Sequence, residues 1–167
     1  MLIRKLEQNE YDLIRNIEYY YESDKEYILK RSGMTFDLDL KDIGHVIKRE
    51  LSINIEDNYL KEVHINVIEQ QGEIIGFIQM GYEEMNKMAV IMNIWVREDK
   101  RRDNIGKKLI KSSKGYARYV NSKGVYVEVD SKNYPAINFL IKNGFDITGI
   151  NEDIINKEVI IGLTSVF

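Results

Sequence analysis

The sequence contains no cysteine, one proline and only two histidines among its 167 residues. Without cysteine, disulfide bonds, thiolate metal ligands and a cysteine nucleophile are excluded. His45 and His64 have no histidine or cysteine partner at metal-ligand spacing, so we expect ordinary structural or surface roles for both, and neither a metal site nor a Ser-His triad. A single proline gives no sign of a domain boundary, and the length fits one domain spanning residues 1–167.

Long apolar runs are also absent from the sequence. No stretch approaches the length of a membrane-spanning helix, and the first residues, MLIRKLEQNEYD, lack the apolar core of a signal peptide. The net charge of −3 argues against general affinity for nucleic acid. We therefore expect a cytoplasmic protein with no nucleic-acid partner and no membrane partner.

The most informative stretch is AVIMNIWVREDKRRDNIGKKL, residues 89–109. Strand formers give way to a short charged connection and then to helical spacing of apolar residues. Such a turn presents unpaired backbone N–H groups at the positive end of the helix dipole. Asn104 and Gly106 tolerate backbone conformations that a close ligand requires. The turn predicts an anion site, phosphate above all, and a turn with a merely solvated basic rim is the alternative. The surrounding cations are Arg101, Arg102, Lys107 and Lys108.

This stretch has neither the spacing of a Walker loop nor that of a GxGxxG fingerprint, which argues against a nucleoside triphosphatase or a dinucleotide enzyme. Periodicity along the whole chain predicts alternating strands and helices. We expect strands over residues 1–6, 62–70, 73–84, 87–96, 125–130, 145–150 and 158–167, and helices over residues 7–21, 40–51, 105–120 and 134–142. This order predicts an α/β (α+β) protein whose three middle strands form an antiparallel meander.

Two motifs resemble those of the GCN5-related N-acetyltransferase (GNAT) family. RRDNIG, after the strand NIWV, is similar to the family's acetyl-CoA-binding motif Q/R-x-x-G-x-G/A, with Arg101 first, Gly106 last and Asn104 in place of a glycine. NYPAINFLIKNGF is similar to the family's N-x-x-A-x-x-F-Y-x-x-x-G-F element; the matching residues are Asn133, Ala136, Phe139, Gly144 and Phe145. The element order is also that of the GNAT fold, a mixed sheet of about seven strands with a splayed centre, flanked by about four helices. EVDSKN and the aromatic end of the last strand look most like streptothricin acetyltransferases.

The resemblance implies acetyl-CoA as the acetyl donor. Backbone groups of Ile94 and Val96 would bind the pantetheine arm and polarise the thioester carbonyl. The diphosphate would lie on the N–H groups of residues 102–107, beside Arg101. The resemblance thus implies these cofactor-binding residues: Ile94, Trp95, Val96, Arg101, Arg102, Asp103, Asn104, Ile105, Gly106, Lys107, Asn133, Ala136 and Phe139.

Polar residues inside apolar strands are candidates for the chemistry. Asn93 and Glu128 lie in strands that we expect to be interior, where an unpaired polar group is costly. We interpret Glu128 as the general base, with a salt bridge or an exposed strand end as the alternative. Tyr126 and Asp130 should share its face, so the predicted substrate-binding residues are Asn93, Tyr126 and Asp130.

The family's general acid is a tyrosine, and Leu140 occupies that position here. Tyr134 is a candidate replacement, although a thiol with a pKa near 8.5 can leave without an acid. The sequence predicts an N-acetyltransferase for a small cationic amine, such as a streptothricin-like or aminoglycoside antibiotic or a polyamine. A protein lysine or N-terminal acetyltransferase and a non-catalytic acyl-CoA sensor are the alternatives, and a homodimer is left open. The acidic residues expected near the acceptor are Glu22, Asp24, Glu26, Asp37, Asp39, Glu83 and Glu84.

Overall fold

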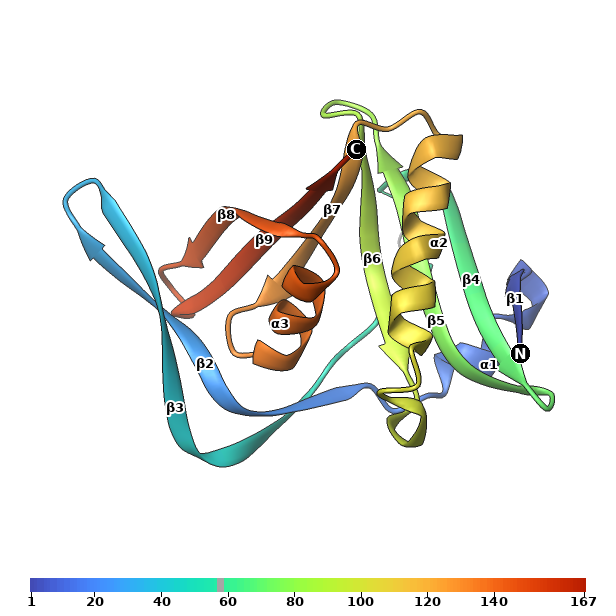
Figure 1. Ribbon diagram of the computed structural model, residues 1–167, viewed down its shortest axis with the longest axis horizontal. Coiled ribbons are helices and arrows are strands. Elements are labelled where there is room, and N and C mark those ends of the chain that lie inside the picture. Colours follow the sequence, from blue (N-terminus) through green and yellow to red (C-terminus); the bar gives the residue numbers. More distant parts are fainter. Residues whose placement is uncertain (57–58) are drawn as a thin grey trace. The chain divides into compact units, whose positions relative to one another are not determined.

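The computed structural model describes residues 1–56 and 59–167 (Figure 1). These residues form two compact units. The first unit comprises Met1–Tyr19, Ser52–Val127 and Ser165–Phe167, and the second comprises Tyr20–Leu51 and Glu128–Thr164.

The main sheet is mixed, as predicted, and its strand order is β1-β4-β5-β6-β7-β9-β8. Its strands are β1 (Leu2–Lys5), β4 (Lys61–Gln70), β5 (Glu73–Glu83), β6 (Met88–Val96), β7 (Gly124–Asp130), β8 (Asp146–Asp153) and β9 (Glu158–Val166). The predicted meander of β4, β5 and β6 is confirmed, because each of these strands pairs antiparallel with the next. Strands β6 and β7 pair in parallel, which requires a crossover, and the helix α2 (Ile105–Tyr119) supplies it.

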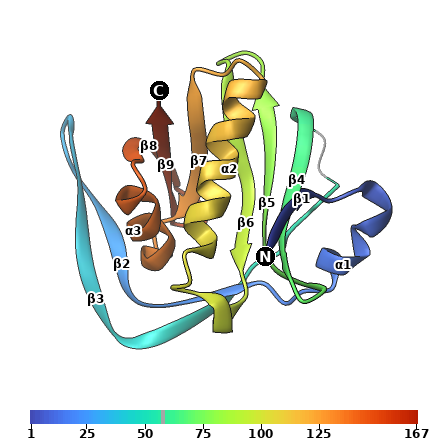
Figure 2. The same cartoon turned by 45° about the vertical axis from the view of Figure 1, so that its right-hand side comes forward.

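Helix α2 lies along β5 and β6 in the first unit (Figure 2). Its buried face includes Ile105, Leu109 and Tyr116, as the helical spacing predicts. The helix approaches the sheet closely at Gly76, where a Cβ atom would lie 2.9 Å from Cγ2 of Ile105. Glycine at this position therefore fixes the distance between helix and sheet.

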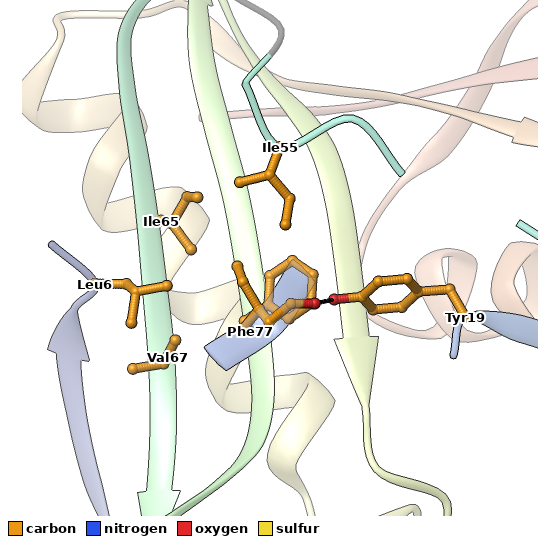
Figure 3. Packing of buried hydrophobic residues seen from close by; sticks show 7 residues of the cluster. Leu6, Tyr19, Ile55, Ile65, Val67 and Phe77 are labelled. Carbon is orange, nitrogen blue, oxygen red and sulfur yellow. Dashed lines mark hydrogen bonds between the residues drawn. The ribbon is translucent and has the colours of Figure 1, made fainter. Parts of the chain in front are cut away.

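The other face of the first unit's strands carries the cluster drawn in Figure 3, which includes Leu6, Ile65, Val67 and Phe77. Tyr19 packs edge-on against Phe77 with ring centroids 5.8 Å apart. Phe77 is 0% exposed, so its ring holds this face of β5 against the cluster while α2 covers the other face.

The expected helix over residues 7–21 is wrong in most of its length. The chain forms a 3₁₀ turn, η1 (Gln8–Glu10), and one helical turn, α1 (Asp12–Arg15). The Tyr19 hydroxyl donates to the carbonyl oxygen of Ile14, which satisfies a group that a longer helix would have used. The helix therefore ends early, and the aromatic run after it begins a strand.

The expected helix over residues 40–51 is also wrong. Strands β2 (Tyr20–Ser32) and β3 (Thr35–Glu50) form a two-stranded antiparallel hairpin in the second unit (Figure 1). His45 therefore lies in a strand, whereas His64 lies in β4 as predicted. The second unit also holds α3 (Tyr134–Lys142), whose bounds agree with the sequence prediction.

Among the described residues, no helix is long and apolar enough to cross a membrane. Within the same residues, no three acidic or histidine side chains gather in an arrangement that would hold a metal ion.

Candidate active site

The pairing of β6 changes along its length. Its register with β7 covers Ala89 to Ile91, so residues 92–96 lie outside that register. On the other side, Gln79 pairs with Asn93 while Met80 pairs with Ile91, which leaves Met92 as the extra residue of a β-bulge. Bulges re-aim the backbone of a strand and are common beside active sites. The bulge therefore marks the point at which β6 is free to pair with something other than β7.

The peptide groups of Ile94 and Val96 face away from β5. The N–H of Arg97 donates to the carbonyl of Ile75 over 2.9 Å, which fixes the hydrogen-bonded positions of this ladder. The direction of the peptide N–H and C=O groups alternates from residue to residue along a strand. The N–H and C=O groups of the residues next to each hydrogen-bonded position therefore point to the opposite edge. A second contact agrees, since Nε of Arg101 donates to the carbonyl oxygen of Val96 over 3.4 Å. These groups can pair with an extended ligand along β6.

The bend after β6 exposes backbone N–H groups. It passes through the 3₁₀ turn η2 (Glu98–Lys100) and enters α2. The N–H of Lys108 donates to the carbonyl oxygen of Asn104, the residue before the helix, at 3.1 Å. The preceding N–H groups belong to Ile105, Gly106 and Lys107, and within residues 1–56 and 59–167 no protein acceptor reaches them. The predicted anion site therefore has its amides unused.

Two residues of the bend have left-handed backbone conformations, Arg102 with φ 72° and Asn104 with φ 61°. Gly106 lies within the first turn of α2 rather than in the bend itself. The N–H of Asp103 is used locally, because it donates to the Lys100 carbonyl at 3.4 Å.

The cations of the bend are exposed and available. Arg101, Arg102 and Lys107 are solvent-exposed, and no acidic residue in the described part of the chain forms an ion pair with them. Arg97, just before the bend, behaves differently, because Glu73 and Asp99 hold its guanidinium at 2.7 and 2.6 Å. Hydrogen bonds from Arg97 hold the pKa of Asp99 below its usual range.

Asn93 is held by a residue that the sequence interpretation missed. Its amide nitrogen donates to Oε1 of Gln79 over 2.7 Å, and Gln79 is 0% exposed. The signal in the sequence was available, since Gln79 is the one polar side chain in the apolar run IIGFIQM.

The second unit holds the predicted catalytic residues of β7 and α3. Glu128 is solvent-exposed, so the expectation of an interior glutamate is wrong. Asp130 is already engaged by Arg49 at 2.6 Å and by the Tyr21 hydroxyl at 3.2 Å. Burial, together with the Asp130 carboxylate, raises the pKa of Tyr21 to about 12. Arg49 and Tyr21 were not predicted as partners, because they lie far from Asp130 in sequence.

Helix α3 begins as the sequence predicts. The Asn133 side chain accepts from the Ala136 N–H at 3.3 Å and so caps the helix. The Tyr134 ring lies against Tyr27, with centroids 6.0 Å apart. Leu140, in the position of the family's acid, is 2% exposed and belongs to the core.

The structure thus groups the predicted residues by unit. Asn93, residues 94–96 and residues 101–107 lie together in the first unit, which also holds Tyr126 of β7. Glu128, Asp130, Asn133, Tyr134, Ala136 and Phe139 lie in the second. The acidic residues expected near the acceptor also divide, because Glu83 and Glu84 belong to the first unit and the others to the β2–β3 hairpin.

A bulged strand that leads through an amide-lined bend into a helix is the arrangement that the resemblance to the acyl-CoA-dependent N-acyltransferases predicts for the donor site. The sequence profile of the acetyltransferase (GNAT) family matches residues 34–145. An N-alpha-acetyltransferase of Sulfurisphaera tokodaii is 30% identical over 142 residues, which cover 72% of this chain and 81% of that protein. The chain therefore belongs to the GNAT family, and it is an acetyl-CoA-dependent N-acetyltransferase.

Two solved structures resemble the whole chain. A Bacillus anthracis str. Ames protein described as a streptothricin acetyltransferase, solved in complex with acetyl coenzyme A, is 26% identical with a TM-score of 0.83, covering 99% of both chains. Nourseothricin acetyltransferase has a TM-score of 0.86 at 18% identity, covering 99% of this chain and 97% of that one. The second likeness shows the fold alone.

Proposed function

We propose that this enzyme acetylates a primary amine of a small cationic substrate of the streptothricin class. The observation that carries the proposal is the likeness, over 99% of both chains, to the protein described as a streptothricin acetyltransferase. The acidic residues of the β2–β3 hairpin, among them Glu22, Asp24 and Asp37, suit a cationic acceptor.

The donor site follows from the first unit. The diphosphate of acetyl-CoA lies on the N–H groups of Ile105, Gly106 and Lys107, with the side chains of Arg101 and Arg102 beside it. The pantetheine arm pairs with β6 at Ile94 and Val96, whose peptide groups face that edge. A backbone donor at the thioester oxygen stabilises the developing charge by about 3–4 kcal/mol.

The reaction is a direct transfer. The neutral amine nitrogen attacks the thioester carbon, the carbon–sulfur bond breaks, and the electron pair leaves on the CoA sulfur. Glu128 takes the amine proton, directly or through water, and its exposure lets an amine from solvent reach it. Because the alkyl side chain of Leu140 cannot donate a proton, the thiolate leaves unassisted or takes a proton from Tyr134.

A second candidate is acetylation of a protein N-terminus. The relative from Sulfurisphaera tokodaii, an N-alpha-acetyltransferase 30% identical to this chain, supports it. The two substrates differ in size and charge, so a panel of acceptors separates them.

The test is release of CoA thiol from acetyl-CoA with nourseothricin, kanamycin, spermidine and a peptide with a free N-terminus. Nourseothricin should give the highest kcat/KM, and nourseothricin with its amines chemically acetylated serves as the control. The highest kcat/KM with the peptide would replace the first candidate by the second. Calorimetric binding of CoA with no turnover of any amine would instead indicate a sensor.

A further inference from the structure

The buried side chain of Gln79 connects a backbone carbonyl to the side chain of Asn93. Nε2 of Gln79 donates to the Ile55 carbonyl oxygen over 2.9 Å, and its Oε1 accepts from Nδ2 of Asn93 over 2.7 Å. All of these residues belong to the first unit.

The direction of this chain of hydrogen bonds is dictated by chemistry. A backbone carbonyl can only accept, so Gln79 must turn its NH₂ group toward Ile55 and its oxygen toward Asn93. Asn93 must then turn its own NH₂ group toward Gln79. Its Oδ1 is consequently directed away from Gln79, and none of the described residues donates to it.

Burying the Gln79 amide costs more free energy of folding than burying an apolar side chain would. It is 0% exposed in a strand whose neighbours Ile78 and Met80 are also buried. An amide buried there is tolerated only when its groups are paired, and an aliphatic side chain of similar size would need no partners. Its presence is therefore better explained by what it does to Asn93 than by stability.

Asn93 is placed beside the peptide assigned to the thioester. A Cβ atom on Gly76 would meet Ile105 of α2, so side chains that alternate with Gly76, those of Phe77 and Gln79, face away from the helix. Asn93 pairs with Gln79 and shares that face. It precedes Ile94, whose peptide group points to the open edge of β6.

We infer that Gln79 is a positioning residue that holds the Asn93 carboxamide with Oδ1 outward, as a fixed hydrogen-bond acceptor for the N–H of the attacking amine. The inference rests on the proposed function and narrows its substrate class. The substrate must carry a hydrogen-bond donor on the atom that receives the acetyl group. A substrate whose atom there can only accept a hydrogen bond is rejected, because it would place a second acceptor against Oδ1 of Asn93.

Steady-state kinetics with nourseothricin and acetyl-CoA test the role in binding. Gln79→Leu frees Asn93 to rotate and should raise KM for nourseothricin about tenfold, the equivalent of one lost hydrogen bond, with KM for acetyl-CoA unchanged. Met80→Leu, on the opposite face of β5, is the matched control and should change neither constant. Equal changes in both KM values for Gln79→Leu would overturn the inference in favour of a purely structural role.

Gln79→Glu adds a readout that a structural role would not give. A neutral glutamic acid donates its O–H to Ile55 and accepts from Asn93, so it reproduces the glutamine, whereas the carboxylate cannot donate. The kcat/KM of this variant relative to wild type should rise as the pH falls, and that of Gln79→Leu should stay flat. A flat ratio for Gln79→Glu would contradict the assignment.

Nuclear magnetic resonance of the side-chain amides separates this inference from the proposed function. In wild type the Asn93 NH₂ protons should be protected from exchange, and Gln79→Leu should remove that protection. If nourseothricin and the other amines give no turnover, the proposed function fails and the role toward the amine fails with it, whereas this measurement still decides whether Gln79 fixes the orientation of Asn93. Unprotected Asn93 amide protons in wild type would overturn it.

Discussion

Arg102 and Asn104 both adopt left-handed backbone conformations, with φ angles of 72° and 61°, on either side of Asp103. Residues with a Cβ atom are strained in this region, and asparagine is among the few that tolerate it. The bend therefore retains a geometry that glycine would adopt more easily, and it does so with an arginine whose side chain is exposed. Backbone strain and positive charge coincide at Arg102.

Substitutions at Arg102 separate these two properties. Arg102→Gly and Arg102→Ala remove the same charge, but only glycine relieves the left-handed strain. We expect the glycine variant to be more stable than the alanine variant by about 1 kcal/mol in urea unfolding. Both should lose CoA affinity to the same extent. Equal stability of the two variants would mean that the backbone at Arg102 is unstrained in solution.

Charge reversal in the bend should weaken binding of the donor. With Arg101→Glu and Arg102→Glu together, calorimetric affinity for CoA should fall by more than about tenfold, and more steeply at low salt, because the diphosphate meets two new negative charges. Lys111→Glu with Lys123→Glu makes the same change in net charge at exposed sites of the first unit. An affinity unchanged by the first pair would remove the phosphate role from the bend.

Glu128→Gln tests the general base. Turnover should fall most at mildly acidic pH, where the amine is mostly protonated and depends on a base. Asp146→Asn, another exposed carboxylate of the second unit, controls for the loss of one charge. If the pH profile of kcat/KM keeps its shape, Glu128 takes no part in proton transfer.

Gly76→Ala should disturb both stability and donor binding. The added Cβ atom would lie 2.9 Å from Ile105 and 3.1 Å from the Trp95 carbonyl oxygen, so α2 must shift. We expect a loss of about 1–3 kcal/mol, together with weaker CoA binding, because Ile105 opens the helix that carries the amides. Gly115→Ala, in the same helix with nothing within 4 Å of the new atom, should instead stabilise the protein. A Gly76→Ala variant with the stability and CoA affinity of wild type would show that close contact at this glycine does not set the position of α2.

His64 should make stability depend on pH. Its ring lies 5.3 Å from that of Tyr116 and 5.9 Å from that of Tyr119, and burial, with a smaller contribution from Lys5, lowers its pKa. A lowered pKa means that the unfolded chain binds the proton more tightly. Stability is therefore greatest above the ordinary histidine pKa near 6.5 and decreases as the pH falls through it.

Thermal unfolding between pH 7.5 and 5 measures this effect. His64→Phe keeps the ring contacts but cannot be protonated, so its melting temperature should fall less over that range than that of wild type. His45→Phe, at an exposed position of the hairpin, is the comparison. Parallel curves for wild type and His64→Phe would exclude His64 as the source.

The second half of the fold could be predicted because its signals are local. Asn133 and Pro135 mark the start of α3, and the strand-to-helix switch before Asn104 marks α2. Local patterns of this kind do not depend on what the rest of the chain does. The proposed site in the first unit follows from the same stretch, so its backbone geometry was accessible from sequence.

The β2–β3 hairpin could not be predicted because a bulge breaks its alternation. Ser23 pairs with Ile47 while Lys25 pairs with Asp42, so residues 43–46 lie opposite Asp24 alone. The spacing from Leu40 to Ile43 and from Ile43 to Ile47 then imitates a helical stripe. Gly44, with φ 83°, lies within this bulge and was the one local sign against a helix.

The partners of Asp130 and Asn93 were missed for a different reason. Arg49 and Gln79 reach them only through tertiary pairing, and no spacing rule links residues so far apart. The exposure of Glu128 could not be predicted, because the burial of β7 stops after Val127 and the apolar residues before it give no sign of that boundary. The alternation of apolar and polar residues alone does not show at which residue a strand becomes exposed to solvent.

The β2–β3 hairpin also affects the solubility of the protein. In the described structure β3 has only β2 as a strand neighbour, and Phe36 and Leu40 on it are 57% and 47% exposed. A long edge strand with exposed apolar side chains favours stacking with the edge strands of other molecules. Asp37, Asp39 and Asp42 are exposed on the same strand, and their like charges oppose such stacking, so the carboxylates that suit a cationic acceptor also favour solubility at high protein concentration.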